Sequence, residues 1–443
     1  MTRIHIQNGR VVDPASGFDA VTDLYLAEGR IAARGAAPDG FVADRTIDAR
    51  DLVVCPGLID LSARLAARLG TLESVESELA AAVAGGVTAI ACPPDAAPVL
   101  DAPDRVERLI QRSAALGLAR VYPLGALTQS LDGEKLAELA ALAGAGCIAF
   151  SPVQPALPDT AVLLRALQYA ATFGYTVRLQ PQDRALVQGG VAHDGQVATR
   201  LGLPGIPVCA ETVALATALQ LARASGARLH FSRISSAAGI ALLREARAAG
   251  LAVSCDVGIH HLHLTDMDVG FFDANARLDP PLRTASDRDA LRAAVADGLA
   301  AICSDHSPVD AADKQRPFGE AAPGASALEL LLPLTLKWAT EMKLPLATAL
   351  ARITCDAAAV LGVEGGTLAV GAPADVCLFD AQDTWRVQPE ALKSRGKNTP
   401  FLGYVMEGRA HPPLMPGLVV FHVVPSLRAA LKAVDAGVDG LVV

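Results

Sequence analysis

The strongest constraint on this chain is a repeated alternation of short apolar runs with longer amphipathic segments. Segments such as Ala161–Ala171 and Ala238–Ala249 repeat their apolar residues at the helical period of about 3.6. Eight strand–helix units predict a closed (β/α)₈ barrel of the TIM type, in the α/β class. An open doubly wound sheet is the alternative, but the first run lacks its glycine-rich phosphate turn. The predicted strands are Leu52–Leu61, Val87–Cys92, Val121–Leu127, Cys147–Ser151, Thr176–Leu179, Arg228–Ile234, Ala252–Val257 and Ala300–Ser304.

The two ends of the chain have a different pattern from the middle. Residues 1–51 and 366–410 contain short runs typical of β-strands, and we expect the two sets to pair. The sequence therefore predicts a small β-sandwich domain from residues 1–54 and 360–415 beside a barrel at 55–359. The tail, residues 416–443, has a strand–helix–strand pattern that belongs to neither unit.

Composition and charge exclude several classes of function. The 443 residues are 51% hydrophobic and carry a net charge of −9, which disfavours binding to nucleic acid or an anionic membrane. The longest apolar stretch, Leu79–Pro94, is interrupted by two glycines and predicts no membrane span. The N-terminus has no signal-peptide pattern, and the eight cysteines are scattered without a C-x-x-C. We therefore expect a cytoplasmic protein with reduced thiols.

Seven segments resemble, in order, the amidohydrolases of the dihydroorotase kind. The resemblance runs from residue 1 to about residue 410, and its specificity comes from the number and order of the segments. The segments are Cys55–Leu61, Gly202–Pro207, His260–Leu262, Pro280–Thr284, Ser304–Pro308, Gly371–Asp375 and Lys397–Gly403.

The resemblance implies a chemistry that depends on two divalent metals at the C-terminal mouth of the barrel. There the metals activate a bridging water and polarise the ring amide of the substrate. Active members supply His-x-His after the first strand and a carboxylate after the fourth. They add one His after each of the fifth and sixth strands and an Asp after the eighth.

Most of these ligands are missing here. The region after the fourth predicted strand, residues 150–154, contains neither Asp nor Lys. Serine and glutamine are weak ligands and a guanidinium repels a cation, so we expect no metal, no cofactor and no catalytic residue beyond a remnant Asp305. The substrate-binding positions of the family are changed to Ala66, Pro94 and Val309. The five degenerate site positions are Ser62, Arg64, Gln180, Arg233 and Asp305.

Several residues that suggest chemistry have a simpler structural interpretation. Because a buried carboxylate needs a positive partner, we expect Asp305 to pair with Arg64 or Arg233. His260 and His261 would point to opposite faces of a strand, which argues against a shared metal site. His230 is expected to be a hydrogen-bonded core histidine. His193 lies in a polar loop and is expected to be exposed.

Two further features favour no enzyme class by themselves. Hydroxyls at Ser62, Ser151 and Ser307 could suggest a nucleophile, but no Gly-x-Ser-x-Gly occurs and no histidine is evidently beside them. The charged segment 312–320 is either solvated surface or a loop facing a partner at the barrel mouth.

The family resemblance implies a specific role for a barrel without metals. Some bacteria carry a non-catalytic dihydroorotase-like chain that binds the catalytic chain of aspartate transcarbamoylase in a large hetero-oligomer of pyrimidine biosynthesis. The expected function is therefore to scaffold or regulate that transferase. Two alternatives remain: a metal-free amidohydrolase whose mouth arginines bind an acidic substrate, and a metal enzyme with unusual ligands.

Overall fold

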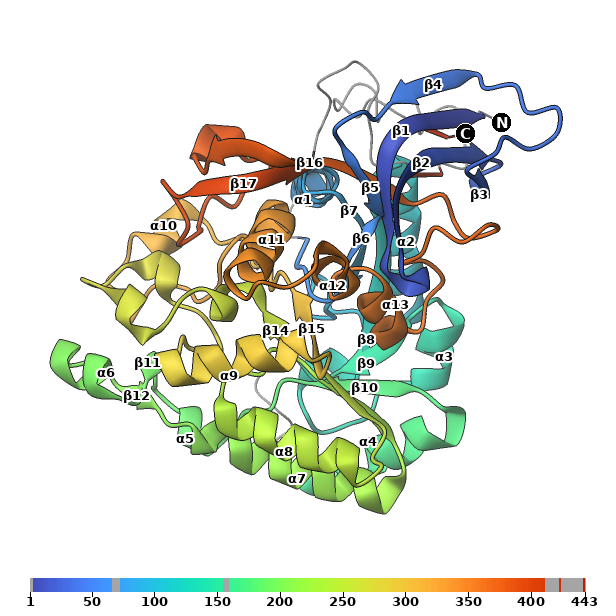
Figure 1. Ribbon diagram of the computed structural model, residues 1–443. Helices are drawn as coiled ribbons and strands as arrows, with labels where there is room; N and C mark the ends of the chain where they lie inside the picture. Colours follow the sequence, from blue (N-terminus) through green and yellow to red (C-terminus); the bar gives the residue numbers. More distant parts are fainter. Residues whose placement is uncertain (1–2, 66–71, 154–158, 411–421, 424–440, 443) are drawn as a thin grey trace.

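Eight parallel strands form a nearly closed barrel in the computed structural model, which describes residues 3–65, 72–153, 159–410, 422–423 and 441–442 (Figure 1). Neighbouring strands follow one another in the sequence, as in a (β/α)₈ barrel, so the predicted fold is confirmed. The barrel strands are β6 (Leu58–Asp60), β7 (Val87–Cys92), β8 (Arg120–Ala126), β9 (Ala149–Ser151), β10 (Thr176–Leu179), β13 (Arg228–Phe231), β14 (Val253–Gly258) and β15 (Ala300–Cys303).

The carboxylate of Asp60 joins the first and last strands of the barrel. Its Oδ1 accepts hydrogen bonds from the backbone N–H groups of Ser304 at 2.8 Å and Ser62 at 3.2 Å. The hydroxyl of Ser304 donates to Oδ2 of the same side chain. Beyond Asp60, the two segments form one backbone hydrogen bond like that of a β-ladder, in which the N–H of Arg64 donates to the carbonyl of His306 at 2.9 Å. A buried side chain thus replaces part of the missing ladder between β6 and β15.

Helices cover the outside of the barrel, and α4, α7 and α8 pack side by side along its lower face in Figure 1. Local sequence fixes their ends: the carboxylate of Asp159 accepts from Ala161 N–H at the start of α4, which ends at the left-handed Gly174. The longer helices are α1 (Leu72–Ala84), α2 (Pro103–Leu116), α4 (Thr160–Phe173), α7 (Cys209–Ser225), α8 (Ala237–Ala248), α9 (Ala285–Ala296) and α11 (Leu331–Glu341). The shorter ones are α3 (Leu139–Gly144), α5 (Arg184–Val187), α6 (Gln196–Leu201), α10 (Ala311–Lys314), α12 (Leu346–Ala351) and α13 (Cys355–Leu361).

Strands from both ends of the chain form a second, seven-stranded sheet above the barrel in Figure 1. The N-terminal strand β1 pairs antiparallel with β2 and parallel with β4 and β5, and β16 joins β5 to the C-terminal β17. A separate sheet domain built from both termini is therefore present, as expected, although its described strands form one seven-stranded sheet where a β-sandwich was predicted. Its strands are β1 (Ile4–Asp13), β2 (Phe18–Ala27), β3 (Arg30–Arg34), β4 (Arg45–Asp48), β5 (Val53–Pro56), β16 (Val376–Arg386) and β17 (Val405–Ala410).

The predicted first strand, Leu52–Leu61, is divided between the two sheets. Its first half is β5 of the terminal sheet, and its second half is β6 of the barrel. Gly57 lies at the break, where a Cβ atom would overlap the side chain of Thr88. Both halves are buried, so the sequence shows one continuous apolar run that predicts a single strand.

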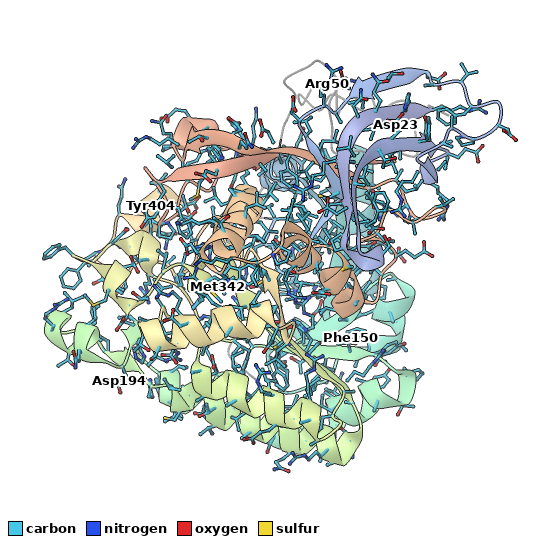
Figure 2. All side chains as sticks on the ribbon, in the orientation of Figure 1. Asp23, Arg50, Phe150, Asp194, Met342 and Tyr404 are labelled. Atoms are coloured by element: carbon cyan, nitrogen blue, oxygen red, sulfur yellow. The ribbon has the colours of Figure 1, made fainter. Side chains whose placement is uncertain are left out.

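Aliphatic side chains fill the core, with a few large aromatic rings among them. Phe150 on β9, labelled in Figure 2, is fully buried and lies 5.2 Å from the ring of Tyr175. All eight cysteines are free thiols. Across the described part of the chain, the helices are all too short or too polar to cross a membrane.

Most of the predicted strand–helix–strand pattern of the tail lies outside the described residues. Within them, β18 (His422–Val423) pairs in parallel with β19 (Leu441–Val442). A further short pair, β11 (Ala192–His193) with β12 (Gly205–Ile206), lies in the long connection after β10.

Candidate functional site

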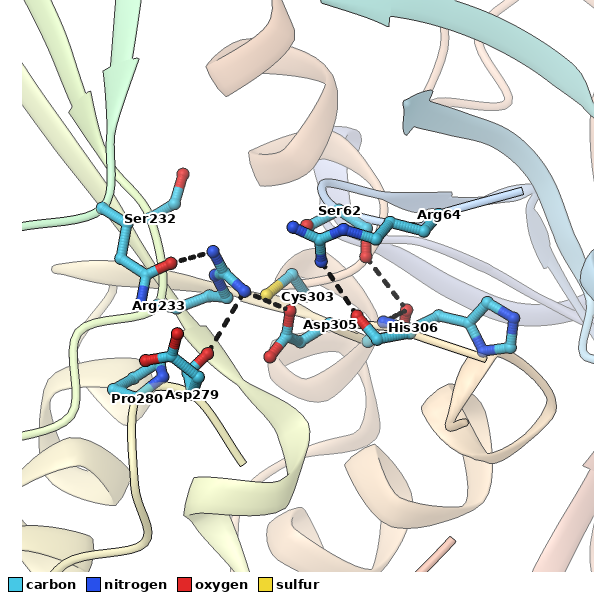
Figure 3. A network of polar contacts seen from close by, with 12 residues as sticks. Ser62, Arg64, Ser232, Arg233, Asp279, Pro280, Cys303, Asp305 and His306 are labelled. Atoms are coloured by element: carbon cyan, nitrogen blue, oxygen red, sulfur yellow. Dashed lines mark hydrogen bonds and ion pairs between the residues drawn. The ribbon is translucent and has the colours of Figure 1, made fainter. Parts of the chain in front are cut away.

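An ion pair between Arg233 and Asp305 lies at the C-terminal mouth of the barrel. Arg233 follows β13 and Asp305 follows β15, and their Nη1 and Oδ1 atoms are 2.8 Å apart (Figure 3). Both side chains are less than a tenth exposed. The same Nη1 also donates to the carbonyl of Asp279 at 3.3 Å. The expected pairing of Asp305 with one of the two arginines is confirmed, and Arg233 is the partner.

Burial and pairing have opposite effects on these two charges. Burial raises the pKa of the Asp305 carboxyl above its ordinary value, although the Arg233 guanidinium opposes this shift. Burial alone would lower the pKa of Arg233, but Asp305 and Asp279 bring it above its ordinary value, so the guanidinium stays charged. Both residues also have left-handed backbones, with φ of 59° at Arg233 and 48° at Asp305. Such backbone strain in non-glycine residues gathers at ligand-binding sites, which is consistent with a mouth derived from one.

Arg64 contacts a different carboxylate. Its Nε donates to Oδ2 of Asp95 at 2.9 Å, and its Nη1 donates to the hydroxyl of Ser307 at 2.9 Å. In Figure 3 Asp305 lies between the side chains of Arg233 and Arg64. Arg64 therefore adds positive charge beside Asp305 without a direct ion pair.

The other predicted positions lie around the same small cavity. Gln180, directly after β10, accepts a hydrogen bond from Nη2 of Arg233 through its Oε1. Ser62, Arg64, Gln180 and Arg233 all line a cavity of about 30 Å³. This is about the volume of one water molecule in the liquid. The structure thus brings the five degenerate positions together in one filled mouth.

These residues do not fit a divalent metal. Of the five positions, Asp305 alone is a carboxylate, and Arg233 already neutralises it. Catalytic zinc sites hold at least three protein ligands, and a guanidinium cannot serve as one. Among residues with described coordinates, no three His, Cys, Asp or Glu side chains are grouped as metal ligands would be. Ala66, one of the changed substrate positions, lies outside the described residues.

A second buried network lies deeper in the barrel. The ring of His230 hydrogen-bonds through Nε2 to Oδ2 of Asp256 at 2.7 Å and through Nδ1 to the hydroxyl of Ser254 at 2.8 Å. Arg178 on β10 donates from Nη2 to the same Oδ2 at 3.2 Å. Burial would raise the pKa of Asp256, but hydrogen bonding and charge from His230 and Arg178 lower it to about 2. The expected core role of His230 is confirmed.

Sequence reasoning missed Arg178 and Asp256, although a signal was available. Arg178 lies on β10 two residues before Gln180, which directly follows that strand, and both side chains line the same pocket. A charged residue at that spacing from a mouth position indicates a charged barrel interior.

His260 and His261 lie on a 3₁₀ helix (Ile259–Leu262). The prediction that they lie on a strand and point to its opposite faces is therefore wrong. Their rings nevertheless have separate environments. His260 stacks on Phe401 with ring centroids 5.8 Å apart, and His261 donates from Nε2 to the carbonyl of Pro280 at 3.2 Å. His263 donates to the carbonyl of Leu334 at 2.9 Å. This arrangement suits structural histidines.

His193 is buried, so the expected surface exposure is wrong. Its side chain packs in the connection after β10, where Nη1 of Arg283 donates to its Nδ1 at 3.1 Å. Burial and the nearby guanidinium lower the pKa of His193 below its ordinary value. The polar sequence of this loop was misleading because β11 pairs with β12, and Arg283 donates to both His193 and the carbonyl of Ile206.

A larger hollow of about 840 Å³ lies beside the mouth. The segment 312–320 contributes Lys314 and Arg316 to its lining, opposite Lys397 and Glu78. Glu78 is itself buried, where its carboxylate accepts from His306 Nε2 at 2.7 Å. The charged segment therefore faces an open hollow. This position is compatible both with solvated surface and with a loop that faces a partner.

Comparisons with known proteins agree with this geometry. The sequence pattern of the Dihydro-orotase-like family matches residues 51–238, and that of the Amidohydrolase family matches residues 187–410. A dihydroorotase-like protein of Pseudomonas putida is 48% identical, with 94% of this chain and 98% of that protein covered. A dihydroorotase of Geobacter sp. (strain M21) is 39% identical over the same shares. The solved L-hydantoinase of Arthrobacter aurescens superposes with a TM-score of 0.81 at 25% identity, covering 93% of this chain and 94% of that one.

Proposed function

The chain belongs to the dihydroorotase-like amidohydrolases, and we propose that it is a non-catalytic member that scaffolds or regulates aspartate transcarbamoylase in pyrimidine biosynthesis. One observation carries the non-catalytic part. The guanidinium of Arg233 bonds to Asp305 at the mouth, where the family resemblance would place metal ions. The last remaining ligand of the family set is thus already paired with a cation.

Energetics support this interpretation. To bind Asp305, a metal ion would have to displace the guanidinium, and separating a buried pair costs about 3–5 kcal/mol. Neither Arg233 nor Gln180 would repay that cost as a ligand. Among the described residues, the space that the degenerate positions line is small, about 30 Å³.

The partner is proposed by analogy with the family. A barrel that keeps its fold but not its ligands retains surfaces for assembly. The relatives in Pseudomonas putida and Pseudomonas aeruginosa are also named dihydroorotase-like proteins and not dihydroorotases. The charged segment 312–320, which lines the hollow beside the mouth, is the segment we would first test as a contact.

Light scattering on a sizing column tests the partnership. Three samples are compared: this chain alone, the aspartate transcarbamoylase chain of the same organism alone, and the two chains mixed. We expect a discrete mixed species with a mass larger than either component. Two unmixed peaks at micromolar concentrations would refute the assembly role.

A ligand screen separates the proposal from a metal-free amidohydrolase that acts on an acidic substrate. Thermal unfolding is measured with orotate, dihydroorotate and carbamoyl aspartate, because a ligand that binds only the folded state raises the melting temperature. We expect no shift, since Arg64 and Arg233 are both engaged with protein carboxylates. A shift of several degrees with one of the three would favour the enzyme.

A further inference from the structure

Large apolar side chains are exposed on the connection between β14 and α9. Phe271 is 100% exposed, Phe272 is 46% exposed, and Met267 on the same connection is 61% exposed. Single apolar residues on a surface are common, but several exposed together, with aromatic rings among them, are typical of interaction sites. We call residues 265–275 the Phe271 loop.

The base of the Phe271 loop is well packed, so a loosely held chain does not explain its exposed tip. Val269 is buried and packs in one apolar cluster with Phe318. The carboxylate of Asp268 accepts from the backbone N–H of Thr265 at 2.7 Å and from its hydroxyl at 3.1 Å. Phe272 has a left-handed backbone with φ of 67°, which is strained for a bulky side chain. Strain of this kind gathers at binding surfaces.

The hollow of about 840 Å³ lies directly beside this tip, because Phe272 and Asp273 form part of its lining. Apart from Asp273, its described lining carries four cationic side chains and two carboxylates. One of these carboxylates belongs to Glu78, which already accepts from His306 Nε2 at 2.7 Å. The hollow therefore has an excess of positive charge.

Two lysines of the hollow bond to neutral groups. The ammonium of Lys314 donates to the carbonyl of Ala274 at 2.8 Å, and that of Lys397 donates to the carbonyl of Leu392 at 2.6 Å. Burial and the nearby guanidinium of Arg277 lower the pKa of Lys314 to about 8. A carboxylate that entered the hollow would oppose both effects, so the hollow favours an acidic surface.

The Phe271 loop has the opposite charge. Residues 265–275 contain three aspartates and neither lysine nor arginine. An apolar tip with acidic flanks matches a hollow that also has Pro308 and Val309 in its lining. Because tip and hollow lie side by side on one chain, two chains related by a twofold axis can each place their tip in the hollow of the other. A second copy of this chain thus supplies both complementary surfaces.

We propose that the chain forms a twofold-symmetric dimer in which the Phe271 loop of each copy enters the hollow of the other copy. Such a contact covers the exposed phenylalanines and brings aspartates of one copy to lysines of the other. The dimer requires no other protein. It would cover the part of the segment 312–320 that lines the hollow, so the dimer and a transferase contact at this segment compete for one surface.

Light scattering over a range of concentrations measures the dimer in the purified full chain. We expect twice the 45.7 kDa mass of one chain at micromolar concentrations. Phe271→Ser should raise the dissociation constant by about 30-fold or more, as expected when a central aromatic side chain is lost from an interface. Phe173→Ser, at a 53% exposed position on α4, is the matched control and should leave it unchanged. Circular dichroism checks that both variants are folded. A monomeric wild type, or an unchanged dissociation constant in Phe271→Ser, would overturn the proposal.

Charge reversal tests why the partner is a second copy. Arg316 lines the hollow and contacts Asp313 of its own segment at 3.1 Å. Arg316→Glu should raise the dissociation constant by at least about tenfold, because it would face the acidic loop. Arg244→Glu, at an exposed pair with Asp297, should have no effect, and equal effects of the two variants would contradict the charge match.

The aspartate transcarbamoylase chain is the competing occupant of this surface. Wild type and Phe271→Ser are each mixed with the transferase and sized in the same way. If the wild type alone is a monomer and Phe271→Ser loses the mixed complex, the surface belongs to the transferase. That result would refute the dimer and leave the proposed function standing, so the two proposals can fail separately.

Discussion

Removing the guanidinium of Arg233 should destabilise the protein far more than removing an exposed arginine. In Arg233→Met, Asp305 remains buried without its cation, and breaking such a pair costs about 3–5 kcal/mol. The exposed pair between Arg10 and Asp19 provides the control, because its side chains are 49% and 37% exposed. Arg10→Met should therefore cost only about 0–1 kcal/mol. Urea unfolding followed by fluorescence and circular dichroism measures both values.

The double variant isolates the pair from the rest of the mouth. Replacing a buried ion pair by apolar side chains is often nearly neutral, so Arg233→Met with Asp305→Leu should recover most of the loss. The coupling energy of this double-mutant cycle should then be at least about 2 kcal/mol. Additive effects of the two substitutions, or a loss under about 1 kcal/mol in Arg233→Met, would refute the ion pair.

The pH dependence of the single variant gives an independent check. Burial already raises the pKa of Asp305, and loss of Arg233 raises it further. A folded-state pKa above the unfolded value means that the folded variant binds the proton more tightly. The deficit of Arg233→Met relative to wild type should therefore be largest near neutral pH and shrink as the pH falls toward 4.

Two other buried features make quantitative predictions about stability. Asp60→Ala should cost about 2–5 kcal/mol in urea unfolding, because the backbone N–H of Ser304 loses its acceptor where the barrel closes; a cost under about 1 kcal/mol would show that the carboxylate does not join these strands. Burial lowers the pKa of His260 to about 3 and those of His261 and His263 to about 4, so their stabilising effect is complete above about pH 6.5 and falls away toward pH 4. Burial raises the pKa of Asp60 to about 6, so near pH 5 this carboxyl binds a proton in the folded state but not in the unfolded state. Its effect on the pH dependence of stability is therefore opposite to that of one histidine. Near pH 5 one proton bound by the unfolded chain but not by the folded ring of His260 corresponds to about 1.4 kcal/mol of lost stability per pH unit, so His260→Leu should reduce the measured slope by about that amount; an unchanged slope would mean that His260 is protonated in the folded protein.

Much of the architecture follows from local sequence, because strands and helices differ in their apolar period. The barrel strands β7 and β10 have the bounds predicted for them. The error at the first strand arose where two buried strands are joined through Gly57 without a polar residue between them. The start of α9 is fixed by a local contact, in which the hydroxyl of Thr284 accepts from the backbone N–H of Asp287.

The candidate site shows where sequence reasoning ends. The five degenerate positions follow from the family order of ligands, and the choice of Arg233 over Arg64 as partner of Asp305 required coordinates. That choice depends on the separate carboxylate of Asp95, which captures Arg64. Burial of His193 likewise depends on Arg283, which is distant in sequence. Long-range pairing of polar side chains leaves no local periodic signal.

The proposal that the mouth excludes divalent metals can be tested on the purified protein itself. The protein is prepared without chelator, and its zinc, manganese and iron contents are determined by mass spectrometry. Because Arg233 occupies the remaining carboxylate, we expect well under one equivalent of metal and no change in melting temperature with a chelator. One equivalent or more of zinc, lost together with stability on chelation, would contradict a non-catalytic barrel.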